Sequence, residues 1–207
     1  MTKIKLCGMT RFEDIEAANM LMPDYVGFVF AKKSLRYITP EAASDFRKKL
    51  NQKIGAVGVF VDEEPAKILE LVNAGIIQII QLHGKEDENY TERLKNFAQC
   101  PIIKAFGIKS ERDILAAMKS PADYVMLDSQ TGGTGTSFDW ALVKKINRPY
   151  FLAGGLGPEN VAKAVIKYRP YAVDVSSGIE TDGFKDINKM KEFVHAVNCA
   201  ERKAGEL

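Results

Sequence analysis

The sequence has few cysteines, and none of them are paired in a recognisable motif. Cys7, Cys100 and Cys199 are the three cysteines, an odd number at wide spacings, and no CxxC pair occurs. This distribution argues against a disulfide framework and against a zinc site. We therefore expect no metal ligand set and a reducing compartment.

Long apolar stretches and blocks of like charge are missing as well. No segment approaches the roughly 20 apolar residues that a transmembrane helix needs, and the N-terminal MTKIKLCG has no apolar core or cleavage pattern of a signal peptide. The net charge is only +2, and no polybasic run suggests a nucleic-acid or membrane-surface partner. We expect a cytoplasmic protein without either partner.

What the 207 residues do contain is a repeated alternation of strand-like and helix-like segments. Short runs rich in Val, Ile and Phe, several of them continuously apolar, are typical of parallel strands covered on both faces. Helix-start signals, such as Thr39-Pro40-Glu41 and Ser110-Glu111, lie between them. The predicted strands are Ile4–Cys7, Tyr25–Phe30, Gly55–Val61, Ile76–Leu82, Ile102–Phe106, Tyr124–Asp128, Tyr150–Ala153 and Ala172–Val175.

Eight such units fill the chain and leave no room for a second domain. The alternation predicts an α/β protein with a parallel sheet and helices outside it. We interpret residues 1–207 as a single (β/α)₈ TIM barrel, whose active site would lie at the carboxyl ends of the strands. An open, doubly wound sheet is the alternative that periodicity alone leaves open.

Reactive side chains gather at the predicted carboxyl ends. The first strand ends in Cys7 and the sixth in Asp128. A thiolate can act as a general base if a nearby positive charge lowers its pKa, and a buried carboxyl group can act as a general acid. Taken singly, a free cysteine is more often a core residue and the aspartate a helix cap, but their shared placement favours catalysis.

The loops after the seventh and eighth strands have the composition of a phosphate site. Gly154 and Gly155 would let backbone N–H groups approach an anion, and Pro158 and Glu159 would then start a helix with a positive N-terminal end. From the next strand, donors would come from Ser176, Ser177 and Gly178. The glycine-rich loop 132–136 after the sixth strand would form a third side of this phosphate site.

Three further polar residues are candidates for binding substrate. Arg36 could hold a carboxylate with its planar fork or be a solvated surface residue. His83 could carry a proton, donate a hydrogen bond or be structural. Asp174 could touch a sugar hydroxyl or brace Ser176 and Ser177.

These motifs, in this order and over nearly the whole chain, resemble the phosphoribosylanthranilate isomerase family. Leu35 and Met9 depart from the residues that are usual there. The matching segments are KLCGMT at 5–10, GFVF at 27–30, SLRY at 34–37, VGVFV at 57–61, QLHG at 81–84, GGTG at 132–135 with FDW at 138–140, LAGGL at 152–156 with PENV at 158–161, and DVSSGIE at 174–180.

The resemblance implies an Amadori rearrangement without a metal or other cofactor. N-(5′-phosphoribosyl)anthranilate would become 1-(2-carboxyphenylamino)-1-deoxyribulose 5-phosphate in tryptophan biosynthesis. The family's general acid corresponds to Asp128, its general base to Cys7 and its carboxylate-binding arginine to Arg36.

Two other readings of the function stay open from the sequence. One is another phosphosugar barrel enzyme, which would share the phosphate loops but not Cys7, Asp128 and Arg36 together. The other is a barrel that binds phosphorylated ligands without turnover. In every case the expected partner is a small-molecule substrate, and the chain would be a monomer or a homodimer.

Overall fold

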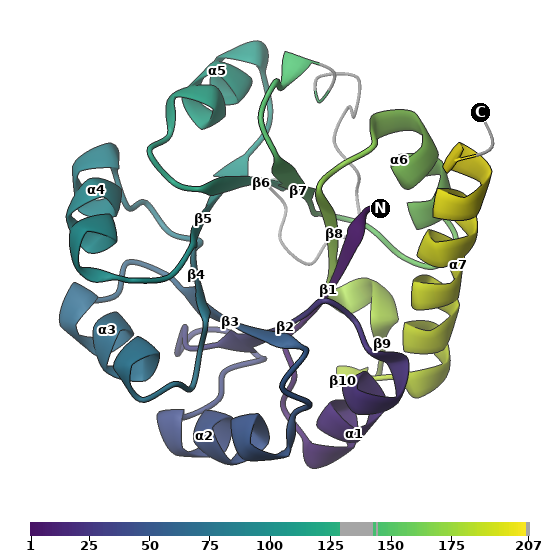
Figure 1. Ribbon diagram of the computed structural model, residues 1–207, viewed down its shortest axis with the longest axis horizontal. Helices are drawn as coiled ribbons and strands as arrows, with labels where there is room; N and C mark the ends of the chain where they lie inside the picture. Colours follow the sequence, from purple (N-terminus) through teal and green to yellow (C-terminus); the bar gives the residue numbers. More distant parts are fainter. Residues whose placement is uncertain (129–142, 144, 206–207) are drawn as a thin grey trace.

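Eight parallel strands close into a barrel with helices around it (Figure 1). The computed structural model describes residues 1–128, 143 and 145–205. Each strand pairs in parallel with its neighbours in chain order, and β8 pairs with β1, which confirms the (β/α)₈ prediction over the open sheet. The strands are β1 (Lys3–Cys7), β2 (Tyr25–Val29), β3 (Gly55–Phe60), β4 (Ile79–Leu82), β5 (Ile102–Gly107), β6 (Tyr124–Asp128), β7 (Tyr150–Leu152) and β8 (Ala172–Val175).

The outer layer consists of helices whose starts mostly follow from local sequence. Thr39 caps one of them by accepting a hydrogen bond from Ala42 N at 3.2 Å, and Ser110 forms a capping box with Asp113 in another. The described helices are α1 (Phe12–Leu21), α2 (Pro40–Lys49), α3 (Pro65–Asn73), α4 (Glu88–Phe97), α5 (Glu111–Lys119), α6 (Val161–Tyr168) and α7 (Ile187–Gly205). After β8 the chain forms a short 3₁₀ helix, η2 (Ser177–Ile179), and a small hairpin of β9 (Glu180–Thr181) and β10 (Phe184–Lys185).

Alternate residues of each strand face different layers. Leu6, Phe28 and Val173 belong to the large core between the barrel and the helices, whereas Val57, Met126 and Phe151 belong to a second core inside the barrel. The two-residue period of a strand makes this division. It also fixes which strand-end residues face the interior, among them Cys7, which packs with Val29 and Val59.

Aromatic rings fill the barrel at the amino ends of the strands. Phe151 is buried there and packs against the rings of Tyr25, Tyr124 and Tyr171, and the Tyr124 and Tyr171 rings stack at 4.7 Å. The Tyr171 hydroxyl lies 3.3 Å from the Tyr25 hydroxyl and 3.4 Å from the Tyr124 hydroxyl. We call these four residues the aromatic floor, which closes the end of the barrel opposite the predicted site.

Two sequence predictions were wrong by more than one residue at element boundaries. The fourth strand begins at Ile79 and not at Ile76, because the Ile76 N–H bonds to Leu71 O and so closes the end of α3. The helix after β7 begins at Val161, so Pro158 and Glu159 lie in the preceding turn and do not start the helix. The loop 132–136 and the FDW motif at 138–140 lie outside the described residues.

Within residues 1–128, 143 and 145–205, no helix combines the length and the apolar character that crossing a membrane requires.

Candidate active site

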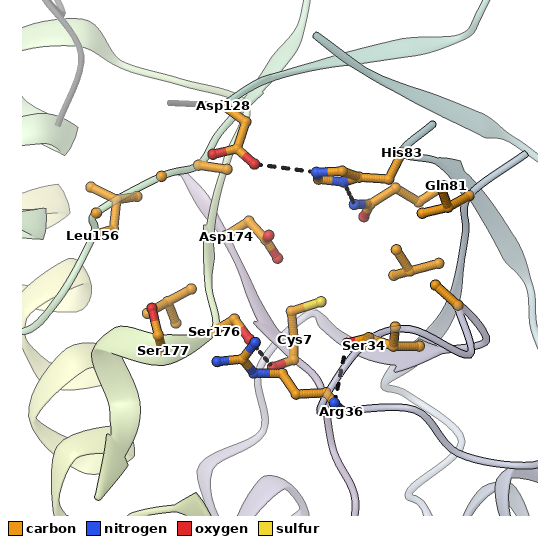
Figure 2. Close-up of a pocket in the computed structure, with 18 residues that line it drawn as sticks. Cys7, Ser34, Arg36, Gln81, His83, Asp128, Leu156, Asp174, Ser176 and Ser177 are labelled. Carbon is orange, nitrogen blue, oxygen red and sulfur yellow. Dashed lines mark hydrogen bonds and ion pairs between the residues drawn. The ribbon is translucent and has the colours of Figure 1, made fainter. Parts of the chain in front are cut away.

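A cavity of about 280 Å³ opens at the carboxyl ends of the strands (Figure 2). Most of the predicted site residues line it together, although they come from six strands or the loops after them. Those lining residues are Cys7, Arg36, His83, Asp128, Gly154, Gly155, Asp174, Ser176 and Ser177. Gly178 is not among them, because it packs against the loop after β7.

Cys7 ends β1 with its thiol directed into this cavity (Figure 2). Burial raises the pKa of the Cys7 thiol above its usual value, while the charge of Lys5 lowers it and that of Asp174 raises it. Lys185 acts in the same direction as Lys5. The thiolate is therefore disfavoured by burial and favoured by the two nearby lysines.

Lys5 lies two residues before Cys7 on the same strand and is fully buried inside the barrel. Its Nζ donates a hydrogen bond of 2.7 Å to Asp174 Oδ1 on the neighbouring strand β8. Burial alone would lower the pKa of Lys5, but the negative charges of Asp174 and Cys7 together raise it above its usual value. The site thus has a fixed positive charge beneath it.

Asp128 ends β6 and faces the same cavity as Cys7 from the opposite side (Figure 2). Its Oδ2 lies 3.2 Å from His83 Nε2, and the other ring nitrogen, Nδ1, lies 2.9 Å from Gln81 Nε2. The helix that Asp128 could cap would follow β6, in a segment that lies outside the described residues. Asp128, His83 and Gln81 form a chain that leads from the cavity into the barrel interior.

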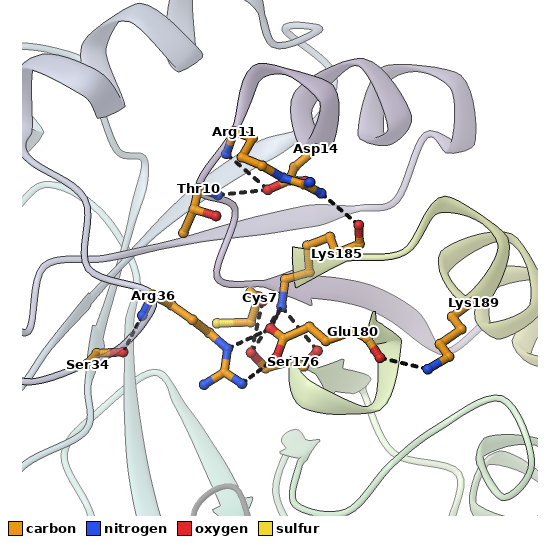
Figure 3. A network of polar contacts seen from close by, with 10 residues as sticks. All are labelled: Cys7, Thr10, Arg11, Asp14, Ser34, Arg36, Ser176, Glu180, Lys185 and Lys189. Atoms are coloured by element: carbon orange, nitrogen blue, oxygen red, sulfur yellow. Dashed lines mark hydrogen bonds and ion pairs between the residues drawn. The ribbon is translucent and has the colours of Figure 1, made fainter. Parts of the chain in front are cut away.

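Arg36 is held in a network of charges beside Cys7 (Figure 3). Its Nε and Nη2 donate bonds of 2.7 and 2.6 Å to the two carboxylate oxygens of Glu180. Lys185 Nζ donates to Glu180 Oε1 at 2.5 Å and to Ser176 O at 3.1 Å. Burial alone would raise the pKa of Glu180, but Arg36 and Lys185 together hold it below its usual value. Burial also lowers the pKa of Lys185.

The residues that depart from the family pattern do not disturb this arrangement. Leu35 is 99% exposed, and Arg36 beside it is held by Glu180 and by Ser34, whose Oγ accepts a 3.1 Å bond from Arg36 N. Met9 is fully buried in the outer core.

The loops after β7 and β8 provide backbone donors at the edge of the cavity. Gly154 and Gly155 have φ values of 85° and 65°, which side chains rarely allow. Their N–H groups have no hydrogen-bond partner among the described residues. Asn160 braces the turn, since its Nδ2 donates to Gly155 O at 2.7 Å and its Oδ1 accepts from Gly157 N at 3.0 Å.

The two serines after β8 differ in their freedom to bind a ligand. Ser176 Oγ donates to Cys7 O at 3.0 Å and accepts a 3.3 Å bond from Lys185, so its hydroxyl proton is already used. Ser177 lines the cavity and is exposed. A Cβ on Gly178 would lie 2.0 Å from Leu156 O, so only glycine allows the two loops to pack this closely.

Sequence reasoning missed several residues that complete the site. Lys185 was not noted at all, and four others were noted only as members of family motifs: Lys5, Gln81, Asn160 and Glu180. Lys5 had a detectable signal, because a lysine between Ile4 and Leu6 interrupts an apolar strand on its inward side. Lys185 had no such signal, since its position beside the site depends on the hairpin after β8.

The described part of the chain contains no group of three or more His, Cys, Asp or Glu side chains placed to hold a metal ion.

Comparisons with known proteins point to one enzyme family. Residues 4–196 match the family model for N-(5′phosphoribosyl)anthranilate (PRA) isomerase. The N-(5′-phosphoribosyl)anthranilate isomerase of Endomicrobium trichonymphae is 44% identical over 198 residues, covering 94% of this chain and 97% of that protein.

Two solved structures show the same likeness. A phosphoribosyl anthranilate isomerase in complex with reduced 1-(o-carboxyphenylamino)-1-deoxyribulose 5-phosphate has a TM-score of 0.85 and 37% identity, covering 96% of this chain and 100% of that one. The dimeric phosphoribosylanthranilate isomerase of Thermotoga maritima, solved as monomers, has a TM-score of 0.84 and 38% identity with the same coverage.

Proposed function

Because this chain belongs to the N-(5′-phosphoribosyl)anthranilate isomerase family, we propose that Cys7 and Asp128 are the base and the acid with which it performs the family's reaction. That reaction is the isomerisation of N-(5′-phosphoribosyl)anthranilate to 1-(2-carboxyphenylamino)-1-deoxyribulose 5-phosphate in tryptophan biosynthesis. It converts an aldose derivative to a ketose derivative, so it moves protons and leaves the overall oxidation state unchanged.

Asp128 would act first. Its protonated carboxyl group gives a proton to the furanose ring oxygen, the bond between that oxygen and C1′ breaks, and the anthranilate nitrogen forms a protonated imine with C1′. His83 Nε2, 3.2 Å from Asp128 Oδ2, is placed to stabilise the carboxylate that remains.

Cys7 would act second. Its thiolate removes the proton from C2′, and the electron pair of that bond neutralises the imine to give an enolamine. The enolamine then tautomerises to the ketone product. Lys5 and Lys185 favour the thiolate that this step requires, against the burial that disfavours it.

The observation that carries this proposal is the placement of the two groups. Cys7 and Asp128 lie on nonadjacent strands, β1 and β6, and both face one cavity of about 280 Å³ (Figure 2). A ligand between them would present different atoms to each group, as an acid and a base acting at two positions of one sugar require.

The remaining lining residues have matching proposed roles. The N–H groups of Gly154 and Gly155, which have no partner among the described residues, and the Ser177 hydroxyl would bind the phosphate. Gly178 supports this cradle by allowing the loops to pack, and Ser176 braces it through Cys7 O.

Arg36 would hold the anthranilate carboxylate. Arg36 donates hydrogen bonds from Nε and Nη2 to Glu180. Among the described residues its Nη1 has no hydrogen-bond partner, so that nitrogen is the one available to substrate. Asp174 uses Oδ1 for Lys5, which leaves Oδ2 to accept a bond from a sugar hydroxyl.

The proposal is tested by a fluorescence assay of phosphoribosylanthranilate turnover in the wild type, Cys7→Ala and Asp128→Asn. Each substitution should lower kcat by about 10²–10⁴-fold, the usual contribution of a general acid or base. Cys199→Ala and Asp45→Asn are matched controls, since Cys199 lies in α7 and Asp45 is an exposed residue of α2. Unchanged kcat in Cys7→Ala would exclude it as the base, and no turnover by the wild type would favour a binding protein.

Two broader predictions belong to the same proposal. The three cysteines are free, which supports a reducing, cytoplasmic setting. The chain would work on its small-molecule substrate as a monomer or a homodimer, and the Thermotoga maritima relative is described as dimeric. Sedimentation equilibrium distinguishes the two states.

A further inference from the structure

Gln81 is a buried amide directly behind the candidate acid. It is 1% exposed and lies on β4, two residues before His83. Its Nε2 lies 2.9 Å from His83 Nδ1 and 3.4 Å from Met126 Sδ, while its buried Oε1 has no hydrogen-bond partner among the described residues. A buried acceptor without a partner destabilises the folded state, so packing alone does not explain a glutamine at this position.

The amide determines which nitrogen of His83 carries the proton. A neutral imidazole has one N–H donor and one acceptor nitrogen, whereas an amide nitrogen only donates. Because Gln81 Nε2 faces Nδ1, Nδ1 must accept, and the proton of His83 is on Nε2. His83 Nε2 then donates to Asp128 Oδ2 at 3.2 Å.

The opposite orientation of the amide makes fewer hydrogen bonds. Turning the Gln81 side chain by 180° would place Oε1 against His83 Nδ1 and against the sulfur of Met126, which has no proton to give in return. It would also put two N–H donors where the unpartnered oxygen now lies. One unsatisfied acceptor is the smaller cost, so the orientation with Nε2 toward His83 is favoured.

The backbone of His83 is held independently of Gln81. His83 N donates a 2.8 Å bond to Phe60 O. The loop that follows is held by Glu86, which accepts bonds from Gly84 N at 2.9 Å and from the buried Lys104 Nζ at 2.7 Å. Gln81 is therefore not needed to hold the His83 backbone, and what it adds is a hydrogen bond to the ring nitrogen Nδ1.

We propose that Gln81 is a positioning residue that keeps His83 in its Nε2–H tautomer, so that His83 presents a hydrogen-bond donor to the Asp128 carboxylate. This inference rests on the proposed role of Asp128 as the acid. Once Asp128 has protonated the ring oxygen, the new carboxylate meets a donor that is already oriented. The other tautomer would turn a nitrogen lone pair toward that negative charge.

The test is ¹⁵N NMR of the histidine rings in the wild type and in Gln81→Met. Methionine has an unbranched side chain of similar length to glutamine, and it lacks both the amide donor and the amide acceptor. The chain has only two histidines, and His195 in α7 serves as the internal reference. At about pH 8, where an ordinary imidazole is neutral, the wild type should show a protonated Nε2 and an unprotonated Nδ1. Gln81→Met should show averaged shifts for the two nitrogens.

Turnover gives the second measurement. Gln81→Met should lower kcat by about tenfold to a hundredfold, as expected for one lost charge-assisted hydrogen bond. KM should change less than about twofold, because the Gln81 side chain is only 1% exposed and its amide nitrogen faces His83. Met126→Leu, a volume-conserving change at the other neighbour of Gln81, should keep the wild-type tautomer and kcat.

The outcomes separate this inference from the proposed function. A wild-type spectrum with the proton on Nδ1 would overturn the inference without any variant. So would Gln81→Met with wild-type ring shifts, or with altered shifts and unchanged kcat. Absence of wild-type turnover would overturn the proposed function, and the spectrum would still decide the tautomer.

Discussion

Replacing Glu180 with glutamine tests the charge network beside Cys7. The Glu180 carboxylate is 10% exposed and accepts bonds of 2.7, 2.6 and 2.5 Å from Arg36 and Lys185. Glutamine keeps one acceptor oxygen but turns an N–H₂ group toward a cation and leaves two positive charges side by side. Breaking a buried ion pair by removing one partner typically costs about 3–5 kcal/mol.

We expect Glu180→Gln to lose about 3 kcal/mol of stability at neutral pH, the lower end of that range because Arg36 is partly exposed. For a chain of this length each kcal/mol corresponds to roughly 2–4 °C in Tm, so the melting temperature should fall by roughly 6–12 °C. Urea unfolding followed by circular dichroism at several pH values measures the difference.

The loss should depend on pH in a defined direction. The pKa of Glu180 is below its usual 4.5 in the folded protein. Such a carboxylate contributes stability that is fully present above its unfolded pKa and disappears as pH falls through its folded pKa. The difference between wild type and Glu180→Gln should therefore be complete above about pH 5 and shrink progressively below about pH 4.5.

A matched control is Glu64→Gln, which removes one charge from an exposed pair with Lys67 and should cost less than about 1 kcal/mol. The reasoning is refuted if Glu180→Gln is as stable as the wild type at neutral pH. It is also refuted if the loss is the same at about pH 3 as at about pH 7.

Three further substitutions test the surroundings of the site. Gly178→Ala places a Cβ 2.0 Å from Leu156 O and should cost about 1–3 kcal/mol and raise KM, whereas a wild-type KM would contradict the close packing of the two loops. Lys5→Met leaves Asp174 without its ion-pair partner and should lower stability by about 3–5 kcal/mol in thermal unfolding. Ser177→Asp should raise KM at least about tenfold, through repulsion of the substrate phosphate, and weaken competitive inhibition by inorganic phosphate; unaltered KM would remove Ser177 from the phosphate site.

The fold could be predicted because its signals are local. Continuous apolar runs and helix starts such as Thr39-Pro40 depend on a few neighbouring residues, and the structure places strands and helices where they predict them. The error at Ile76 has the same origin, because an apolar run does not reveal that its first residues close the preceding helix.

The candidate site could be predicted only in part. Strand-end residues such as Cys7 and Asp128 meet because closure brings all carboxyl ends together. The partners of those residues depend on contacts between distant elements, such as Arg36 with Glu180. That pairing joins the loop after β2 to β9, 144 residues along the chain, and no spacing rule connects them.

The aromatic floor has a kinetic consequence. Phe151 and the rings of Tyr25, Tyr124 and Tyr171 fill the amino-terminal end of the barrel, so a ligand in the cavity has no passage through that end. Substrate and product must then use the same end of the barrel, and one molecule has to depart before the next can bind. The product should accordingly be a competitive inhibitor, and turnover in cells should slow whenever the enzyme that consumes the product falls behind.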